Sequence, residues 1–124
     1  VTSVEEPKLR VFKEEFWGNT PVFLRGGMNG WGIDNPFMYQ GAGVYTVDID
    51  LSAGATEFKV ASEDWSTVNL GNPDGETSNA VTPDSPKAIT TSNNNLLIDV
   101  PAGTYEFKVE GPDGGSPTLT VTEK

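Results

Sequence analysis

The sequence lacks histidine and cysteine altogether among its 124 residues. Because imidazole and thiolate groups are missing, Ser-His-Asp triads, cysteine nucleophiles and nearly all transition-metal sites are excluded. Disulfide bonds are excluded as well, but their absence does not decide the compartment, since bacterial secreted proteins often do without them. Most familiar hydrolytic mechanisms are therefore closed to this chain.

One catalytic option survives these absences, a pair of carboxylates of the kind used in glycoside hydrolysis. Asp48 and Asp50 form one candidate pair, and Glu63 and Asp64 form another. The first pair is expected on the solvent face of a strand and the second in a turn. We interpret both pairs as solvated surface charges, and we predict that the chain is not an enzyme.

Basic residues are scarce, with eight Lys and Arg against eighteen Asp and Glu and a formal net charge of −10. An acidic surface repels phosphate backbones and anionic lipids. No run approaches the roughly 18 apolar residues of a membrane helix, and no signal segment opens the chain. We expect no nucleic-acid partner, no membrane partner, and a monomer that is one piece of a longer protein.

Helical spacing of apolar residues is almost absent, and period-two alternation of apolar and polar residues recurs in its place. The clearest strand is 44–51, followed by a turn and a second strand within 53–60. The segment 53–60, AGATEFKV, is echoed by 102–109, AGTYEFKV, which follows an apolar strand at 96–100. The repeat predicts two hairpins that share one pattern.

The whole chain is expected to form one domain, because its length suits a single hydrophobic core. Further strands are predicted at 9–12, 22–25, 88–89 and 118–122. With turn signals at short intervals, the pattern predicts an all-β fold, an immunoglobulin-like antiparallel β-sandwich of about eight strands spanning 1–124. The polar segment 71–87 is predicted to be a long surface loop.

Calcium is the one ion for which the sequence offers ligands at close spacing, in the segment 72–76, NPDGE. An ordinary polar turn is the interpretation that we adopt. We expect no bound metal and no cofactor.

Two tryptophans stand in polar or glycine-rich turns just past predicted strand ends, Trp31 in GGMNGWG and Trp65 in SEDWST. An exposed indole is a natural platform for the apolar face of a glucose ring. The alternative is that either ring is core, because immunoglobulin-like sandwiches commonly bury one tryptophan. For Trp17, packing against the core or the N-terminal segment is the interpretation that we favour.

A sugar also needs hydrogen bonds around its rim. Lys59 lies on the polar face of a predicted strand, and the amides of 93–95 precede the next strand. These groups can donate to and accept from hydroxyls. On spacing alone, however, a lysine such as Lys59 is more often a solvated charge opposite the core face of a strand, and an asparagine triplet is more often a turn.

The run 22–31, VFLRGGMNGW, followed by 56–60, TEFKV, and then Trp65, resembles the starch- and glycogen-binding modules attached to amylases, pullulanases and related enzymes. Their pattern is a strand ending in Gly-x-Phe/Met-Asn-x-Trp, a later strand with aromatic-Lys, a second Trp, and an Asn before the next apolar strand. In this chain that Asn falls within 93–95. The resemblance extends from about 22 to 100, and within it 39–45 and 61–68 are especially similar to bacterial enzymes that attack raw starch.

The resemblance implies that Trp31 and Trp65 stack on consecutive glucose rings, that Lys59 donates to a hydroxyl, and that Asn94 or Asn95 binds hydroxyls across the groove. It implies a non-catalytic module that binds alpha-1,4-linked glucan, meaning starch, glycogen, cyclodextrin and malto-oligosaccharides. The module would direct an attached amylase or pullulanase, secreted by a bacterium, to its extracellular substrate. The loop 71–87 is longer than in the kinase-type glycogen-binding module of the same group.

Two other functions are compatible with the sequence. The chain could be a structural immunoglobulin-like spacer in a multidomain secreted enzyme, with both tryptophans buried. It could also be an adhesion or surface-layer module whose acidic loops bind calcium.

Overall fold

The computed structural model describes residue 17 and residues 20–111 and 117–124. In these ranges the strands and one short 3-10 helix follow the order β1 (Val22–Gly26), η2 (Gly27–Asn29), β2 (Met38–Gly41), β3 (Val44–Leu51), β4 (Gly54–Ser62), β5 (Asn69–Gly71), β6 (Ala80–Val81), β7 (Lys87–Ala88), β8 (Thr90–Thr91), β9 (Leu96–Val100), β10 (Gly103–Glu110) and β11 (Thr118–Glu123).

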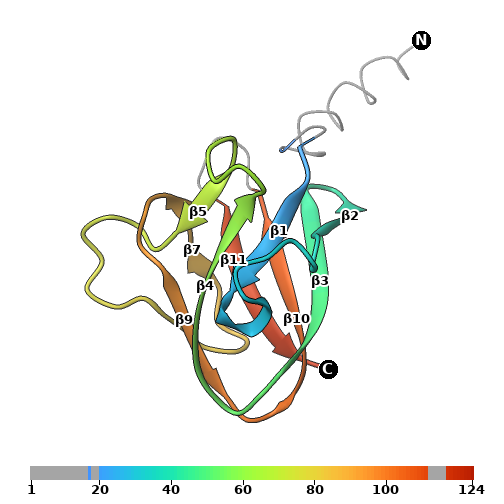
Figure 1. Cartoon of the computed structure of the whole chain (residues 1–124), viewed down its shortest axis with the longest axis vertical. Helices are drawn as coiled ribbons and strands as arrows, with labels where there is room; N and C mark the ends of the chain where they lie inside the picture. Colours follow the sequence, from blue (N-terminus) through green and yellow to red (C-terminus); the bar gives the residue numbers. More distant parts are fainter. Residues whose placement is uncertain (1–16, 18–19, 112–116) are drawn as a thin grey trace.

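The strands form two sheets that pack face to face (Figure 1). The first sheet has the order β6-β9-β4-β5-β8. Its sixth strand, β1, lies off this path and pairs with β4 in antiparallel fashion. The second sheet has the order β2-β3-β10-β11-β7. The prediction of an all-β sandwich is therefore confirmed. The strand 9–12 that the alternation also predicts lies outside the described residues.

The core lies between the sheets because alternate residues of each long strand point inward. In β4 the inward residues are Phe58 and Val60, and in β10 they are Phe107 and Val109, all fully buried. The rings of Phe58 and Phe107 meet edge to face across the two sheets, 5.4 Å apart at 88°. This geometry is the one that aromatic quadrupoles favour.

The predicted hairpins were wrong in their pairing, although the strands themselves are right. β3 and β4 belong to different sheets, and so do β9 and β10. Each repeat is therefore an arch that crosses from one sheet to the other, and the arches stack so that β3 pairs with β10 and β4 with β9. Alternation alone could not tell the two apart, because a hairpin and an arch both point their apolar residues at the core.

Two further details differ from the prediction. Four observed strands were not predicted, β2, β5, β6 and β8, and the last three of these have only two or three residues each. The loop 71–87 contains one of them, β6, which buries Val81 and pairs in parallel with β9. Strands of two residues are too short to show alternation. Within the described ranges, no helix is long and apolar enough to cross a membrane.

Candidate ligand-binding site

The candidate site lies on the outer face of the first sheet, where β1 and β4 run side by side. Arg25 of β1 is directly opposite Lys59 of β4 in the antiparallel register. Both side chains point away from the core, because Phe58 and Val60 on either side of Lys59 point into it. The turns that follow these two strands then cover Arg25.

The first turn carries Trp31 and follows β1 directly. The side chain of Asn29 closes it, since Oδ1 accepts from the Gly26 N–H at 3.1 Å and Nδ2 donates to the Leu24 carbonyl at 2.7 Å. A side chain at Gly26 would overlap the backbone of Glu57. The Gly-x-Met-Asn-x-Trp pattern is therefore a turn that seats Trp31 against β4.

The second turn carries Trp65 and follows β4. Oδ1 of Asp64 accepts from the Ser62 hydroxyl and from the backbone N–H groups of Ser66 and Thr67, and Oδ2 accepts from the Thr67 hydroxyl at 2.7 Å. The hydroxyls of Ser62 and Thr67, followed by the two N–H groups, hold the pKa of Asp64 well below its usual range. Asp64 is thus the organising residue of this turn and more than a solvated charge.

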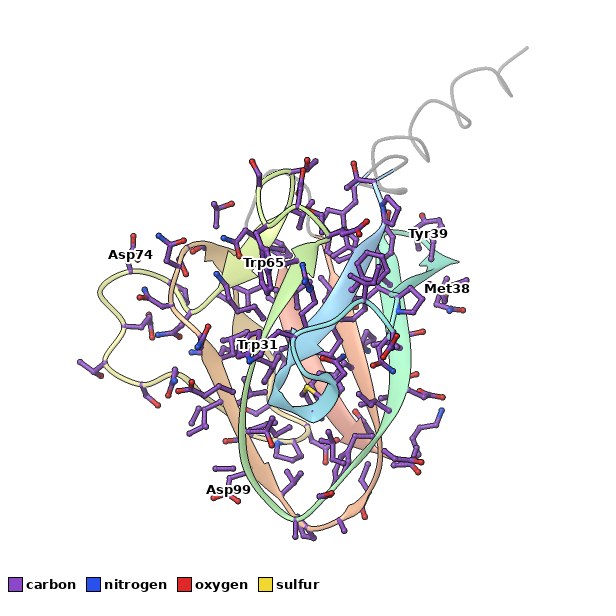
Figure 2. The ribbon with its side chains drawn as sticks, viewed as in Figure 1. Trp31, Met38, Tyr39, Trp65, Asp74 and Asp99 are labelled. Carbon is purple, nitrogen blue, oxygen red and sulfur yellow. The ribbon has the colours of Figure 1, made fainter. Side chains whose placement is uncertain are left out.

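The two turns bring the indoles of Trp31 and Trp65 together at the surface (Figure 2). Their ring centroids are 6.1 Å apart and the ring planes are inclined by 49°. Trp65 is 36% exposed and Trp31 is partly exposed, and neither belongs to the buried core. The pair presents an angled aromatic surface to solvent.

Both tryptophans have a left-handed backbone, with φ of 62° at Trp31 and 60° at Trp65. A bulky residue in this region costs of order 1–3 kcal/mol and persists only when its surroundings enforce it. Strain of this kind concentrates at functional sites.

Arg25 is the residue that connects the two turns. Its Nε and Nη2 donate to the Trp31 carbonyl at 3.0 and 2.6 Å. Its Nη1 donates to the carbonyls of Ser62 and Glu63 at 2.9 and 3.0 Å. The guanidinium carbon also lies 3.8 Å from the centroid of the Trp65 ring, within cation–π range. Only 8% of Arg25 is exposed.

Lys59 is 5% exposed, and its ammonium donates to the Ser92 carbonyl. Burial lowers the pKa of Lys59, because desolvation disfavours the charged form. Its side chain passes over Gly71, where any added Cβ would crowd it and overlap the Asn94 carbonyl. Lys59 thus ties β4 to the turn that carries the asparagine triplet.

The amides of Asn94 and Asn95 lie beside a polar depression of about 670 Å³. The Asn94 amide donates to Asp74 Oδ1 at 2.8 Å, and the Asn95 amide donates to Glu57 Oε1 at 3.1 Å. Glu57 also lines a second, smaller depression that contains Trp31. The two depressions therefore share Glu57, one of them lined also by Trp31 and the other by the asparagines.

Trp17 lies apart from this surface. It packs against the core, with its ring 4.3 Å from that of Tyr45 and 5.9 Å from that of Phe37. This position agrees with the interpretation that Trp17 has a packing role.

The carboxylates considered for catalysis are not gathered in one place. Asp48 and Asp50 lie on β3, in the other sheet, where Asp48 pairs with Lys124 at 3.4 Å and Asp50 accepts from Thr104. Asp64 serves its own turn. No cluster of three or more His, Cys, Asp or Glu able to hold a metal occurs among the residues that the structure describes.

Sequence reasoning missed two residues of the site. Arg25 went unnoticed because a charged residue in a strand is ordinarily read as a solvent-facing position. The available signal was its place, an arginine in an apolar strand directly before the glycine-rich tryptophan turn. Asp64 was assigned to the surface, but Ser62, Asp64 and Thr67 together have the spacing of a side-chain-bonded turn.

The fold places the chain in the class of two-sheet β-sandwiches to which starch-binding domains belong. The solved structures include a similar one, the ligand-induced structure of AmyP-SBD, a starch-binding domain, with a TM-score of 0.65. The sequences are 20% identical, and the match covers 86% of this chain and 73% of that one. No protein-family model and no curated protein matches the sequence. The resemblance to starch-binding modules is therefore supported by a shared fold.

Proposed function

We propose that the chain is a non-catalytic module that binds alpha-1,4-linked glucan on the surface formed by Trp31 and Trp65. The observation behind the proposal is the pair of partly exposed indoles, 6.1 Å apart and inclined by 49°. Amylose forms a left-handed spiral with a curved apolar face. Two rings set at an angle fit that curve, whereas coplanar rings fit a flat chain such as cellulose.

Hydrogen bonds from the polar depression complete the site in this proposal. Asn94 and Asn95 supply amide groups and Glu57 a carboxylate beside the indoles. These groups suit sugar hydroxyls, which both donate and accept. In the proposal Lys59, which is 5% exposed, supports the turn of the asparagines through its hydrogen bond to the Ser92 carbonyl.

The expected affinity follows from the area that a glucan would cover. If each indole buries roughly 100 Å² of apolar surface, the gain is about 2.5 kcal/mol per ring before ordering costs. Hydrogen bonds supply part of the remainder. We expect dissociation constants for soluble oligosaccharides between roughly 1 µM and 1 mM. On granular starch, multiple sites raise the apparent affinity.

The module would hold an attached, secreted amylase or pullulanase on its substrate. The net charge of −10 does not oppose this role, because the ligand is neutral. The competing function, an immunoglobulin-like spacer, needs no surface aromatics, and the exposure of Trp65 favours binding over that alternative.

Titration with beta-cyclodextrin tests the proposal. Tryptophan fluorescence should change in a saturable way, and calorimetry should give the same dissociation constant. Cellohexaose, whose chain is flat, serves as the control ligand and should leave the signal unchanged. A protein that responds to neither cyclodextrin nor maltoheptaose, and that does not sediment with starch granules, would be a spacer.

A further inference from the structure

We infer that Arg25 is a positioning residue that fixes the distance and angle between Trp31 and Trp65 before any ligand arrives. As a statement about binding, this inference rests on the proposed function. As a statement about the free protein, it rests on geometry alone. The guanidinium contacts both tryptophan turns, through hydrogen bonds to backbone carbonyls of each and through its position over the Trp65 ring.

The hydrogen bonds of Arg25 act on the strained parts of the backbone. Its bonds to the Trp31 carbonyl hold a residue whose φ is 62°. Its bonds to the carbonyls of Ser62 and Glu63 fix the chain just before Trp65, whose φ is 60°. A left-handed bulky residue relaxes unless its surroundings hold it. The planar guanidinium of an arginine has five N–H donors and can bond to both turns at once, whereas the ammonium of a lysine in the same place cannot.

The stacking contact of Arg25 also decides which face of Trp65 is available. The guanidinium carbon lies 3.8 Å from the ring centroid, so it covers one face of the indole. The other face is left for a sugar. Because the same side chain sets the inclination of 49° between the rings, it also determines the preference for a curved glucan over a short linear one.

Circular dichroism of the unliganded protein gives a readout that a merely structural role would not change. Two indoles at this distance couple and give a paired signal in their far-ultraviolet band. We assign to the pair the component of the spectrum that disappears in the Trp31→Phe variant and in the Trp65→Phe variant but persists in the Trp17→Phe variant. We expect folded Arg25→Met to lose it, and Arg25→Lys, which keeps the charge but not the fork, to weaken it.

Binding provides the second readout. Affinity of Arg25→Met for beta-cyclodextrin should fall about tenfold or more, because two rings must then be ordered on binding. Affinity for maltotriose should fall less, so the dissociation constants of the variant for maltotriose and for beta-cyclodextrin should differ by a smaller factor than those of the wild type. Thermal unfolding monitored at the sheet band verifies that each variant is folded.

A folded Arg25→Met protein with the wild-type paired signal and wild-type affinity would overturn the inference. If Arg25→Met does not fold, the Arg25→Lys variant provides the test. An unchanged paired signal and unchanged affinity in Arg25→Lys would also overturn the inference. Failure of the wild-type protein to bind any glucan would remove the proposed function but leave the spectroscopic result for the free protein intact.

Discussion

The two regions of the candidate site are held in different ways. The tryptophan region is fixed from below, by a buried arginine that bonds to backbone carbonyls of both turns. The backbone of the asparagine turn is also tied to β4 by a buried cation, Lys59, but the amide groups of Asn94 and Asn95 are held at the surface, by exposed side-chain pairs with Asp74 and Glu57. Buried bonds to backbone are hard to exchange, whereas exposed side-chain bonds exchange readily with water or hydroxyls.

The difference suggests a division of labour within the proposed glucan site. The indoles form a preset surface that selects the shape of the ligand. The amides and carboxylates around the depression can give up their mutual hydrogen bonds in favour of sugar hydroxyls. Recognition would then combine a rigid part and an adaptable part, and each part can be tested separately.

The largest effect is expected from the tryptophans. Trp31→Ala or Trp65→Ala should abolish sedimentation with starch and weaken beta-cyclodextrin binding roughly thirtyfold, because about 2 kcal/mol of apolar contact is lost. The melting temperature should change little, since neither ring is in the core. Trp17→Phe is the matched control and should keep binding. A collapse of folding in either alanine variant would assign that ring to the core.

A smaller effect is expected from the asparagine region. Asn95→Ala should weaken the binding of maltoheptaose about fivefold, which corresponds to the loss of one net hydrogen bond of about 1 kcal/mol. The binding of maltotriose should weaken less. Calorimetry across oligosaccharide lengths measures the difference. Asp99→Asn is the control, because Asp99 is exposed on β9 and lies away from Trp31 (Figure 2). Equal losses at every length would contradict an adaptable outer region.

Gly71 offers a test of how far the two regions are coupled through Lys59. Gly71→Ala should destabilise the fold by about 1–3 kcal/mol, because the new methyl overlaps the Asn94 carbonyl and crowds the Lys59 side chain. The loss of glucan affinity should be small for short ligands, since the atoms nearest the added methyl belong to Asn94, Lys59 and Ser92 and to neither tryptophan turn. Urea unfolding together with a cyclodextrin titration separates the two quantities, and an unchanged midpoint of unfolding would be inconsistent with this packing.

The smallest effect concerns pH. When folding lowers the pKa of a carboxyl, the ionised carboxylate stabilises the folded state. That stabilisation is fully present above the unfolded pKa, about 3.9, and is lost as the pH falls through the folded pKa. Because the folded pKa of Asp64 is lowered, the Trp65 turn should stay intact at mildly acidic pH. Cyclodextrin binding should be constant from neutral pH to about 5, and Asp64→Asn should bind more weakly than the wild type throughout. A wild-type affinity in that variant would remove Asp64 from the site.

The longer strands among the described residues could be predicted from the sequence to within about two residues at each end. The predicted strands 44–51 and 96–100 coincide with β3 and β9, because alternation records which residues face the core. Their pairing could not be predicted. Alternation says nothing about whether the next strand returns beside its predecessor or crosses to the opposite sheet, and here both repeats cross.

The site could be predicted only in its exposed parts. The polar turns of Trp31 and Trp65 left open whether each ring lies at the surface or in the core, and the resemblance to starch-binding modules favoured the surface. The roles of Arg25 and Lys59 depend on contacts between residues 37 or 33 positions apart. Such contacts arise from strand register and turn geometry, which no local pattern records.

The burial of Arg25 and Lys59 also has a consequence for how the protein responds to dissolved electrolytes. Mobile ions weaken interactions between exposed charges, but they reach buried groups far less. Arg25 and Lys59 are only 8% and 5% exposed. High salt that screens the acidic surface charges should therefore have little effect on the interactions of these two cations. An uncharged polysaccharide would therefore meet the same aromatic surface in fresh water and in concentrated salt.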